Sequence, residues 1–213
     1  MNHSLVRAAA VALLATTLAA PLAAQDIRAI DPGPSRRGFW IGLGLAASSV
    51  DADCNACNSA DPQTFGGSHI RLGGTLSPHV RLGADLFGAT KKNGIFGDLT
   101  GSSVDVTETA GHLVASIWYY PQSAGNLWLQ FGMGGVVYQA DVKSDQKYSA
   151  VGGGGLLGIG YDFRVGRNGS ITPYLNFVGS SDGKLKDEDG NEITGGDKWK
   201  TRYVTFGVDY VFH

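Results

Sequence analysis

The chain has 213 residues, of which 32 are glycine, and its formal net charge is -2 at pH 7. This length suits one domain, and the moderately apolar, aromatic-rich composition excludes the disordered and fibrous classes. Glycine in this amount argues against helices, where each glycine costs about 1 kcal/mol relative to alanine. Because no basic face or arm is present, we expect no nucleic-acid partner.

Residues 1–24 have the layout of a secretory signal peptide. Arg7 precedes an apolar run from Ala8 to Ala20, and the segment PLAA at 21–24 supplies the cleavage site. The run is shorter than a stop-transfer helix, and nothing after it approaches the ~20 uninterrupted apolar residues of a transmembrane helix. We predict export with cleavage after residue 24; a retained N-terminal membrane anchor is the alternative.

The sequence pattern changes at Gly38, where the main domain is expected to begin. Residues 25–37 are polar and without period, which predicts a short periplasmic lead-in. From Gly38 onward apolar residues alternate with small or polar ones, as in strands whose two faces meet different environments. Eight segments show this alternation, at 39–45, 69–76, 80–86, 112–119, 127–134, 151–163, 171–177 and 203–212.

The connections between these segments are short and long in strict alternation. The short ones are 77–79, 121–126 and 166–169, and the long ones are 51–65, 91–105, 141–148 and 180–198. Outer-membrane barrels have short periplasmic turns and long extracellular loops in this order. The sequence therefore predicts an all-β fold for 38–213, an up-and-down antiparallel transmembrane β-barrel of eight strands in the cell outer membrane.

Aromatic residues gather at the predicted strand ends. We expect them to form belts at the two membrane interfaces, where tyrosine and tryptophan are enriched. The periplasmic belt would contain Phe39, Trp40, Trp118, Tyr119, Tyr120, Trp128, Tyr161, Phe163, Tyr210 and Phe212, and the outer one Tyr138, Tyr148, Phe177 and Trp199.

The signal peptide, the loop alternation and the closing segment from Tyr203 to Phe212 (YVTFGVDYVF) resemble a known family. It is the OmpA- or OmpX-like outer membrane protein β-barrel domain, and the resemblance covers roughly Gly38 to Phe212. It implies an outer-membrane location and a final aromatic residue read by the barrel-assembly machinery. Phe212 matches that residue, although His213 follows it. The resemblance is architectural and implies a barrel that anchors four loops at the cell surface. We expect no cofactor.

Ten polar side chains fall on the face opposite the apolar one: His69, Arg71, Arg81, Asp85, Glu108, His112, Gln130, Asp162, Asn176 and Asp209. Burying charges is costly unless they pair. If residues 77–79 form a three-residue turn, Arg71 lies directly across from Asp85, whereas a two-residue turn would place lumen residues opposite lipid-facing ones. We therefore predict an Arg71–Asp85 ion pair in the lumen.

Cys54 and Cys57 lie in the first long loop. Export to an oxidising compartment favours a local disulfide between them. A redox site would need a helix N-terminus and a zinc site would need two better ligands, and neither pattern is present.

The glycine-rich segment 153–158 matches a dinucleotide-binding pattern but has no helix after it. We interpret its glycines as room for an aromatic ring from the neighbouring strand.

Lys200 and Arg202 lie on the lipid-facing side of the last strand near its outer end. They can meet lipopolysaccharide phosphates, or they are charges that extend to the interface without a specific partner. Outer-membrane lipid, lipopolysaccharide and the assembly machinery are the partners we expect; the sequence specifies no surface partner.

The predicted function is structural or surface-interacting, because an eight-stranded lumen is just wide enough for side chains. A narrow small-solute channel is the first alternative. A lipid A-modifying enzyme is the second, since Glu108, His112 and Ser116 share the lumen face of one strand. Residues four apart on a strand are separated by about 13 Å, so these three side chains form no triad by themselves. We expect no enzymatic activity and no metal.

Overall fold

The computed structural model describes residues 38–53, 61–93, 95, 105–142, 146–166, 168–181, 183–192 and 199–213. The predictions for the signal peptide, for the lead-in and for Cys54 and Cys57 lie outside these residues. No helix in the described residues is long and apolar enough to cross a membrane.

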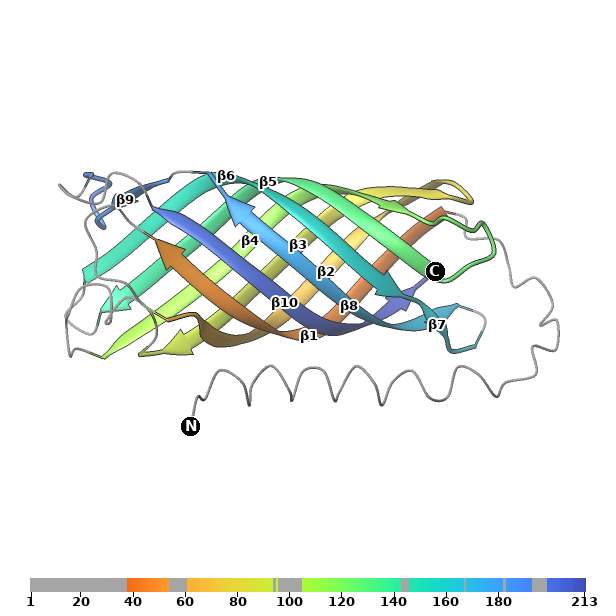
Figure 1. Cartoon of the computed structure of the whole chain (residues 1–213), viewed down its shortest axis with the longest axis horizontal. Coiled ribbons are helices and arrows are strands. Elements are labelled where there is room, and N and C mark those ends of the chain that lie inside the picture. Colours follow the sequence, from red (N-terminus) through yellow and green to blue (C-terminus); the bar gives the residue numbers. More distant parts are fainter. Residues whose placement is uncertain are drawn as a thin grey trace, which may run out of the picture. The chain divides into compact units, whose positions relative to one another are not determined.

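Ten antiparallel strands form a single sheet (Figure 1). Eight of them are long and form the wall: β1 (Gly38–Asp53), β2 (Gln63–Ser77), β3 (Val80–Lys92), β4 (Val106–Tyr119), β5 (Leu127–Val142), β6 (Gln146–Tyr161), β8 (Gly169–Ser180) and β10 (Lys200–Phe212). Two are short: β7 (Phe163–Arg164) pairs with β8, and β9 (Lys184–Lys186) pairs with β6.

The sheet closes on itself. β1 pairs with β2 on one side and with β10 on the other, and β6 pairs with β8 across the remaining gap. Every other long strand pairs with its neighbours in the chain. The predicted eight-stranded up-and-down barrel is therefore confirmed.

The two ends of the barrel differ, and we name them by their connections. The turn rim carries residues 78–79, 120–126, 162–166 and 168, together with Gly38 and His213; the loop rim is the opposite end, where β1 ends at Asp53 and β10 begins at Lys200. Strands extend further toward the loop rim than predicted. β5 ends at Val142 and β6 begins at Gln146, so the expected long connection at 141–148 is mostly strand. Buried and exposed residues still alternate near this end of β5, where the side chains of Tyr138 and Ala140 are buried inside the barrel.

The β2–β3 connection keeps the predicted register by a different route. Pairing resumes directly at Ser77 and Val80, and the register shifts between Thr75 and Ser77. We predicted that a three-residue turn would set this register. Instead the extra residue of the bulge sets it, so that lumen-facing residues of β2 still lie opposite lumen-facing residues of β3.

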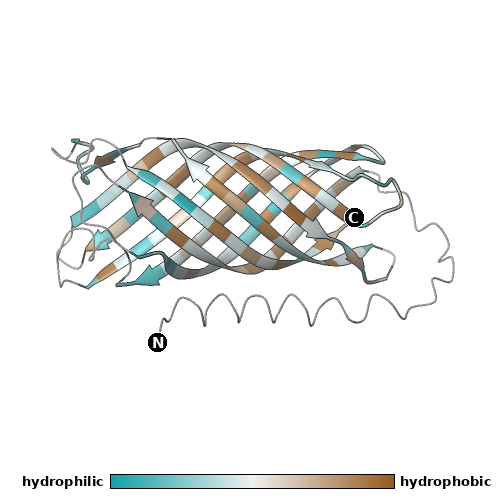
Figure 2. Ribbon diagram, in the orientation of Figure 1, coloured by the Kyte–Doolittle hydropathy of each residue, from teal (hydrophilic) through white to brown (hydrophobic). Residues whose placement is uncertain are grey.

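Alternation divides each strand between the lumen and the outer wall. In β10 buried and exposed residues alternate along the whole strand, and outward Phe206 is 58% exposed. Figure 2 shows hydrophobic residues over the middle of the wall and hydrophilic ones near the loop rim. Large apolar side chains exposed around a closed barrel suit a lipid environment, because water would disfavour such a surface.

The tryptophans do not form interfacial belts, so this prediction is wrong for all four of them. Trp40, Trp118, Trp128 and Trp199 are buried in the lumen, as are Tyr120 and Tyr138. Strand parity places them on the inner face. The exposed aromatic residues near the turn rim are Phe39, Tyr119, Tyr161, Phe163, Tyr210 and Phe212.

Lumen-facing glycines make room for two of the large rings. A Cβ atom at Gly160 would lie 2.3 Å from Cζ2 of Trp128, and one at Gly207 would lie 2.4 Å from the hydroxyl of Tyr174. Each ring therefore occupies the space above a glycine of the adjacent strand. Both glycines lie outside segment 153–158, and the interpretation of that segment's glycines as space for a ring is wrong, because a Cβ at Gly154 would meet Val136 and one at Gly158 would meet Asn176.

Gly160→Ala tests this packing. We expect the free energy of unfolding to fall by about 1–3 kcal/mol, because the new methyl group overlaps the Trp128 ring. Gly179→Ala is the matched control, since a Cβ there meets nothing within 4 Å. Urea titrations in lipid vesicles measure both variants, and equal losses would contradict the proposed role of Gly160.

Candidate functional site: the polar interior of the barrel

All ten predicted lumen residues are buried, each with a relative exposure of 3% or less. Nine of them come from six of the eight long strands, and the tenth, Asp162, lies between β6 and β7. Their contacts form a central network, a cluster at the turn rim and a carboxylate site at the loop rim.

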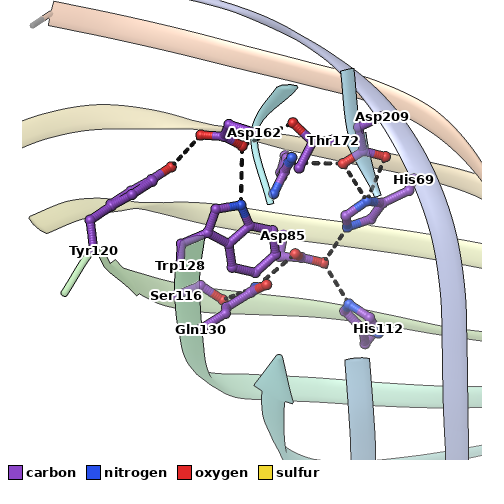
Figure 3. A network of polar contacts seen from close by, with 11 residues as sticks. His69, Asp85, His112, Ser116, Tyr120, Trp128, Gln130, Asp162, Thr172 and Asp209 are labelled. Carbon is purple, nitrogen blue, oxygen red and sulfur yellow. Dashed lines mark hydrogen bonds and ion pairs between the residues drawn. The ribbon is translucent and has the colours of Figure 1, made fainter. Parts of the chain in front are cut away.

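Asp85 on β3 is the centre of the network (Figure 3). Its Oδ1 accepts hydrogen bonds from Nε2 of His69 at 2.9 Å and from Nε2 of His112 at 2.7 Å. Its Oδ2 accepts from Nε2 of Gln130 at 2.8 Å, and the same amide nitrogen donates to Ser116 at 3.0 Å. One carboxylate thereby joins side chains from β2, β4 and β5.

His69 connects Asp85 to a second carboxylate. Its Nδ1 lies 3.0 Å from both oxygens of Asp209 on β10. An ionised carboxylate accepts hydrogen bonds only, so with both aspartates ionised the two ring nitrogens of His69 donate and the ring is positively charged. His112 donates to Asp85 and accepts at Nδ1 from the Tyr203 hydroxyl at 2.7 Å, so a neutral ring suffices there.

Arg71 pairs with Asp209 and not with Asp85, which corrects the predicted ion pair. The backbone register is as predicted, because Arg71 lies directly opposite Asp85. However, Nε of Arg71 lies 2.8 Å from Oδ2 of Asp209. Gly42 on β1 explains the choice: Cγ and Nε of Arg71 lie 2.9 and 3.0 Å from where its Cβ would be, so the side chain crosses β1 toward β10. Two cations and two carboxylates then balance within the network.

The turn-rim cluster surrounds Asp162. This carboxylate accepts from the Tyr120 hydroxyl at 2.9 Å, from Nε1 of Trp128 at 3.1 Å and from the Thr172 hydroxyl at 2.9 Å. Nearby, the Arg81 guanidinium lies 5.1 Å from the Tyr120 ring centroid and 5.4 Å from that of Trp40. Burial of these groups is compensated by hydrogen bonds and cation–π contacts.

His213 completes the turn-rim cluster. Its Nδ1 lies 3.0 Å from Nη2 of Arg81, and its Nε2 lies 2.8 Å from the Ser170 hydroxyl. From the sequence alone, His213 has no role beyond its departure from the family pattern. Its side chain points into the barrel while Phe212 faces outward, as strand alternation requires.

The loop-rim part of the lumen is mostly apolar. Glu108 accepts from the Tyr138 hydroxyl and from the backbone N–H of Ile95. The buried apolar cluster around it includes Val50, Phe65, Phe87, Ile95, Val106, Val136, Leu156, Val178, Leu185 and Trp199. Ile95 and Leu185 come from the connections, so those segments contribute to the packing.

The three residues considered for lipid A chemistry have separate partners. His112 binds Asp85 and Tyr203, whereas Ser116 binds Gln130. Glu108 binds Tyr138. Among the described residues, no group of histidine, cysteine and carboxylate side chains is arranged to hold a metal ion.

Lys200 and Arg202 lie at the loop-rim end of β10, far along the strand from Asp209. The Arg202 side chain faces outward and contacts Asp53, and its Nη2 lies 3.5 Å from Asp51 on neighbouring β1. Part of its charge is therefore already compensated by the protein.

Sequence reasoning missed Tyr203, Trp128 and Tyr174 as members of the interior network. Their positions on the inner face follow from the alternation that located the charged residues. Their partners do not, because these contacts cross the lumen between strands that are distant in the chain.

Comparison with known proteins supports the fold. No protein-family model and no curated protein sequence matches the chain. Solved structures do match, at low identity. The outer membrane protein AlkL has a TM-score of 0.51 and 12% identity, with 88% of this chain and 96% of AlkL covered.

Two further barrels match equally well. Ail, the attachment invasion locus protein of Yersinia pestis, was solved with the heparin analogue sucrose octasulfate; it has a TM-score of 0.50 and 14% identity, with 83% of this chain and 99% of Ail covered. Neisserial surface protein A has a TM-score of 0.50 and 15% identity, with 81% of this chain and 96% of that protein covered. These likenesses show the fold.

A double-mutant cycle tests the pairing of Arg71. We expect Arg71→Met and Asp209→Asn to show a coupling energy of about 0.5–3 kcal/mol, because the two groups are in contact. Arg71→Met and Asp85→Asn should couple more weakly. Urea titrations of the folded barrel give both values, and a larger coupling to Asp85 would contradict the pairing described above.

Proposed function

Because this chain is a small outer-membrane β-barrel of eight strands, we propose that it serves as an anchor that presents its loop rim at the cell surface. The observation that carries the proposal is the filling of the lumen. Buried polar side chains occupy the turn-rim and central parts, and a buried apolar cluster occupies the part near the loop rim. Such an interior favours a plugged barrel over a transport pathway.

The loop rim offers the features of a recognition surface. The β9 segment pairs with β6 and carries an exposed ion pair between Lys184 and Glu192. A turn follows, in which Asp187 accepts from the backbone N–H of Asn191 at 2.8 Å and Gly190 has a φ of 82°. A surface partner would meet charged groups held on strands, which costs less ordering entropy than a free loop.

Sulfated glycans are not the partner class that these charges favour. The heparin analogue in the Ail structure is a ligand of that protein. Here Lys184 is paired with Glu192, and Arg202 contacts Asp51 and Asp53. A basic patch free of carboxylates would be the expected feature for a polyanion.

Two further partners belong to the proposal. Lys200 and Arg202 face the outer-leaflet region and can contact lipopolysaccharide phosphates, although Asp53 competes for Arg202. Phe212 faces the lipid and is available to the assembly machinery during insertion. We propose no enzymatic activity, because His112 and Ser116 are committed to buried structural contacts.

Epitope insertion tests the surface role. A short epitope after Gly190 should be labelled by antibody on intact cells, because the loop rim faces outward in this proposal. The same epitope after Ser123, at the turn rim, is the matched control and should be labelled only after permeabilisation. Labelling of the turn-rim insertion on intact cells would reverse the proposed orientation.

Single-channel recording tests the competing channel function. In planar bilayers we expect no discrete conductance steps, because a buried apolar cluster fills the lumen near the loop rim in the part of the chain that the structure describes. A sixteen-stranded porin reconstituted in the same way provides the positive control. Reproducible steps from the purified barrel would favour the small-solute channel instead.

A further inference from the structure

Six buried side chains in the lumen each have a polar atom without a hydrogen-bond partner among the described residues. The donors are Nε1 of Trp40, Nε1 of Trp118, Nη2 of Arg71 and the hydroxyl of Tyr174, and the acceptors are Oε1 of Gln130 and Oδ1 of Asn176. Each residue is at most 3% exposed. Buried polar atoms are nearly always satisfied in folded proteins.

These atoms belong to neighbouring side chains. The rings of Trp40 and Trp118 meet edge to face, with centroids 4.8 Å apart. Trp118 lies directly opposite Gln130 in the β4–β5 register. Gln130 and Asn176 then flank Gly158, and their free oxygens lie 3.2 and 2.3 Å from the position of a Cβ atom there. The two acceptors therefore face a common point.

The remaining two donors border the same region. The Arg71 guanidinium carbon lies 5.0 Å from the Trp128 ring centroid and 5.9 Å from that of Tyr174. Trp128 and Tyr174 both lie opposite Gly160, two residues along β6 from Gly158. The six polar atoms thus line one continuous part of the lumen between the Asp85 network and the turn-rim cluster.

We propose that this part of the lumen binds ordered water molecules. The chemistry of the lining selects the ligand: four donors and two acceptors need a molecule that both accepts and donates hydrogen bonds. A bare cation would leave the two indole N–H groups and the Arg71 guanidinium without an acceptor, and an anion would leave the oxygens of Gln130 and Asn176 without a donor. A buried water typically makes about three hydrogen bonds to such groups.

The hydrated region ends at the apolar cluster near the loop rim, which includes Phe65, Phe87 and Leu156. Buried polar groups on the loop-rim side bind one another, as the hydroxyls of Ser48 and Thr205 do at 2.6 Å, and Asn176 and Gln130 hold the acceptors that face the proposed water. The site stands independently of the surface role, because it depends only on the lumen side chains.

The four tryptophans allow a test within one molecule. Nε1 of Trp128 donates to Asp162 and Nε1 of Trp199 donates to Thr201, each at 3.1 Å, so these two indoles serve as controls. The experiment is a water–protein NOE and exchange spectrum of the barrel in detergent micelles, with ¹⁵N-labelled tryptophan. Single Trp→Phe variants assign the four indole signals, and backbone-based assignment replaces any variant that fails to fold.

We expect cross-peaks with water at the indole N–H of Trp40 and of Trp118, and none at Trp128 or Trp199. Absence of a cross-peak at either Trp40 or Trp118 would overturn the proposal, because its donor would then face a dry gap. Cross-peaks of equal intensity at all four indoles would also overturn it, since they would indicate general opening of the barrel.

Discussion

The carboxylate of Asp85 is the constraint on which the interior depends. A closed eight-stranded barrel admits little solvent, so a buried carboxylate must obtain its hydrogen bonds from neighbouring strands. Here His69, His112 and Gln130 supply them from β2, β4 and β5. A one-residue slip of any of these strands would turn its donor outward. The network thus specifies the register of four adjacent strands, in addition to neutralising charge.

The two parts of the lumen stabilise the barrel by different means. Near the loop rim, apolar side chains pack together and the connections contribute Ile95 and Leu185. Toward the turn rim, aromatic rings cover charged groups, as Trp128 and Tyr174 do for Arg71. Polar networks require every member to be satisfied, whereas apolar packing tolerates substitutions of similar volume. We therefore expect the part near the loop rim to accept substitutions more readily than the part near the turn rim.

Period-two alternation predicted the orientation of side chains well and their partners poorly. The ten polar residues that it placed in the lumen are all buried, because the side-chain direction in a strand depends only on position. It did not identify Asp209 as the partner of Arg71, since that contact depends on the space above Gly42 on a third strand. The tryptophans were misplaced because a statistical preference for interfaces was given precedence over parity. Strand length at the loop rim was underestimated because hairpin pairing continues beyond the apolar belt.

The absence of matching family models alongside a clear structural match has a physical explanation in this architecture. A barrel wall requires only an outward apolar residue at every second position, and many side chains meet that requirement. The interior adds stricter demands at a few positions, such as Asp85 and its donors, and these can be met by different networks in different barrels. The three matching barrels are 12–15% identical to this chain over more than four-fifths of its length. Such low identity is consistent with a wall that many sequences can form and an interior that differs from one barrel to another. Sequence comparison therefore loses the relationship while backbone geometry retains it.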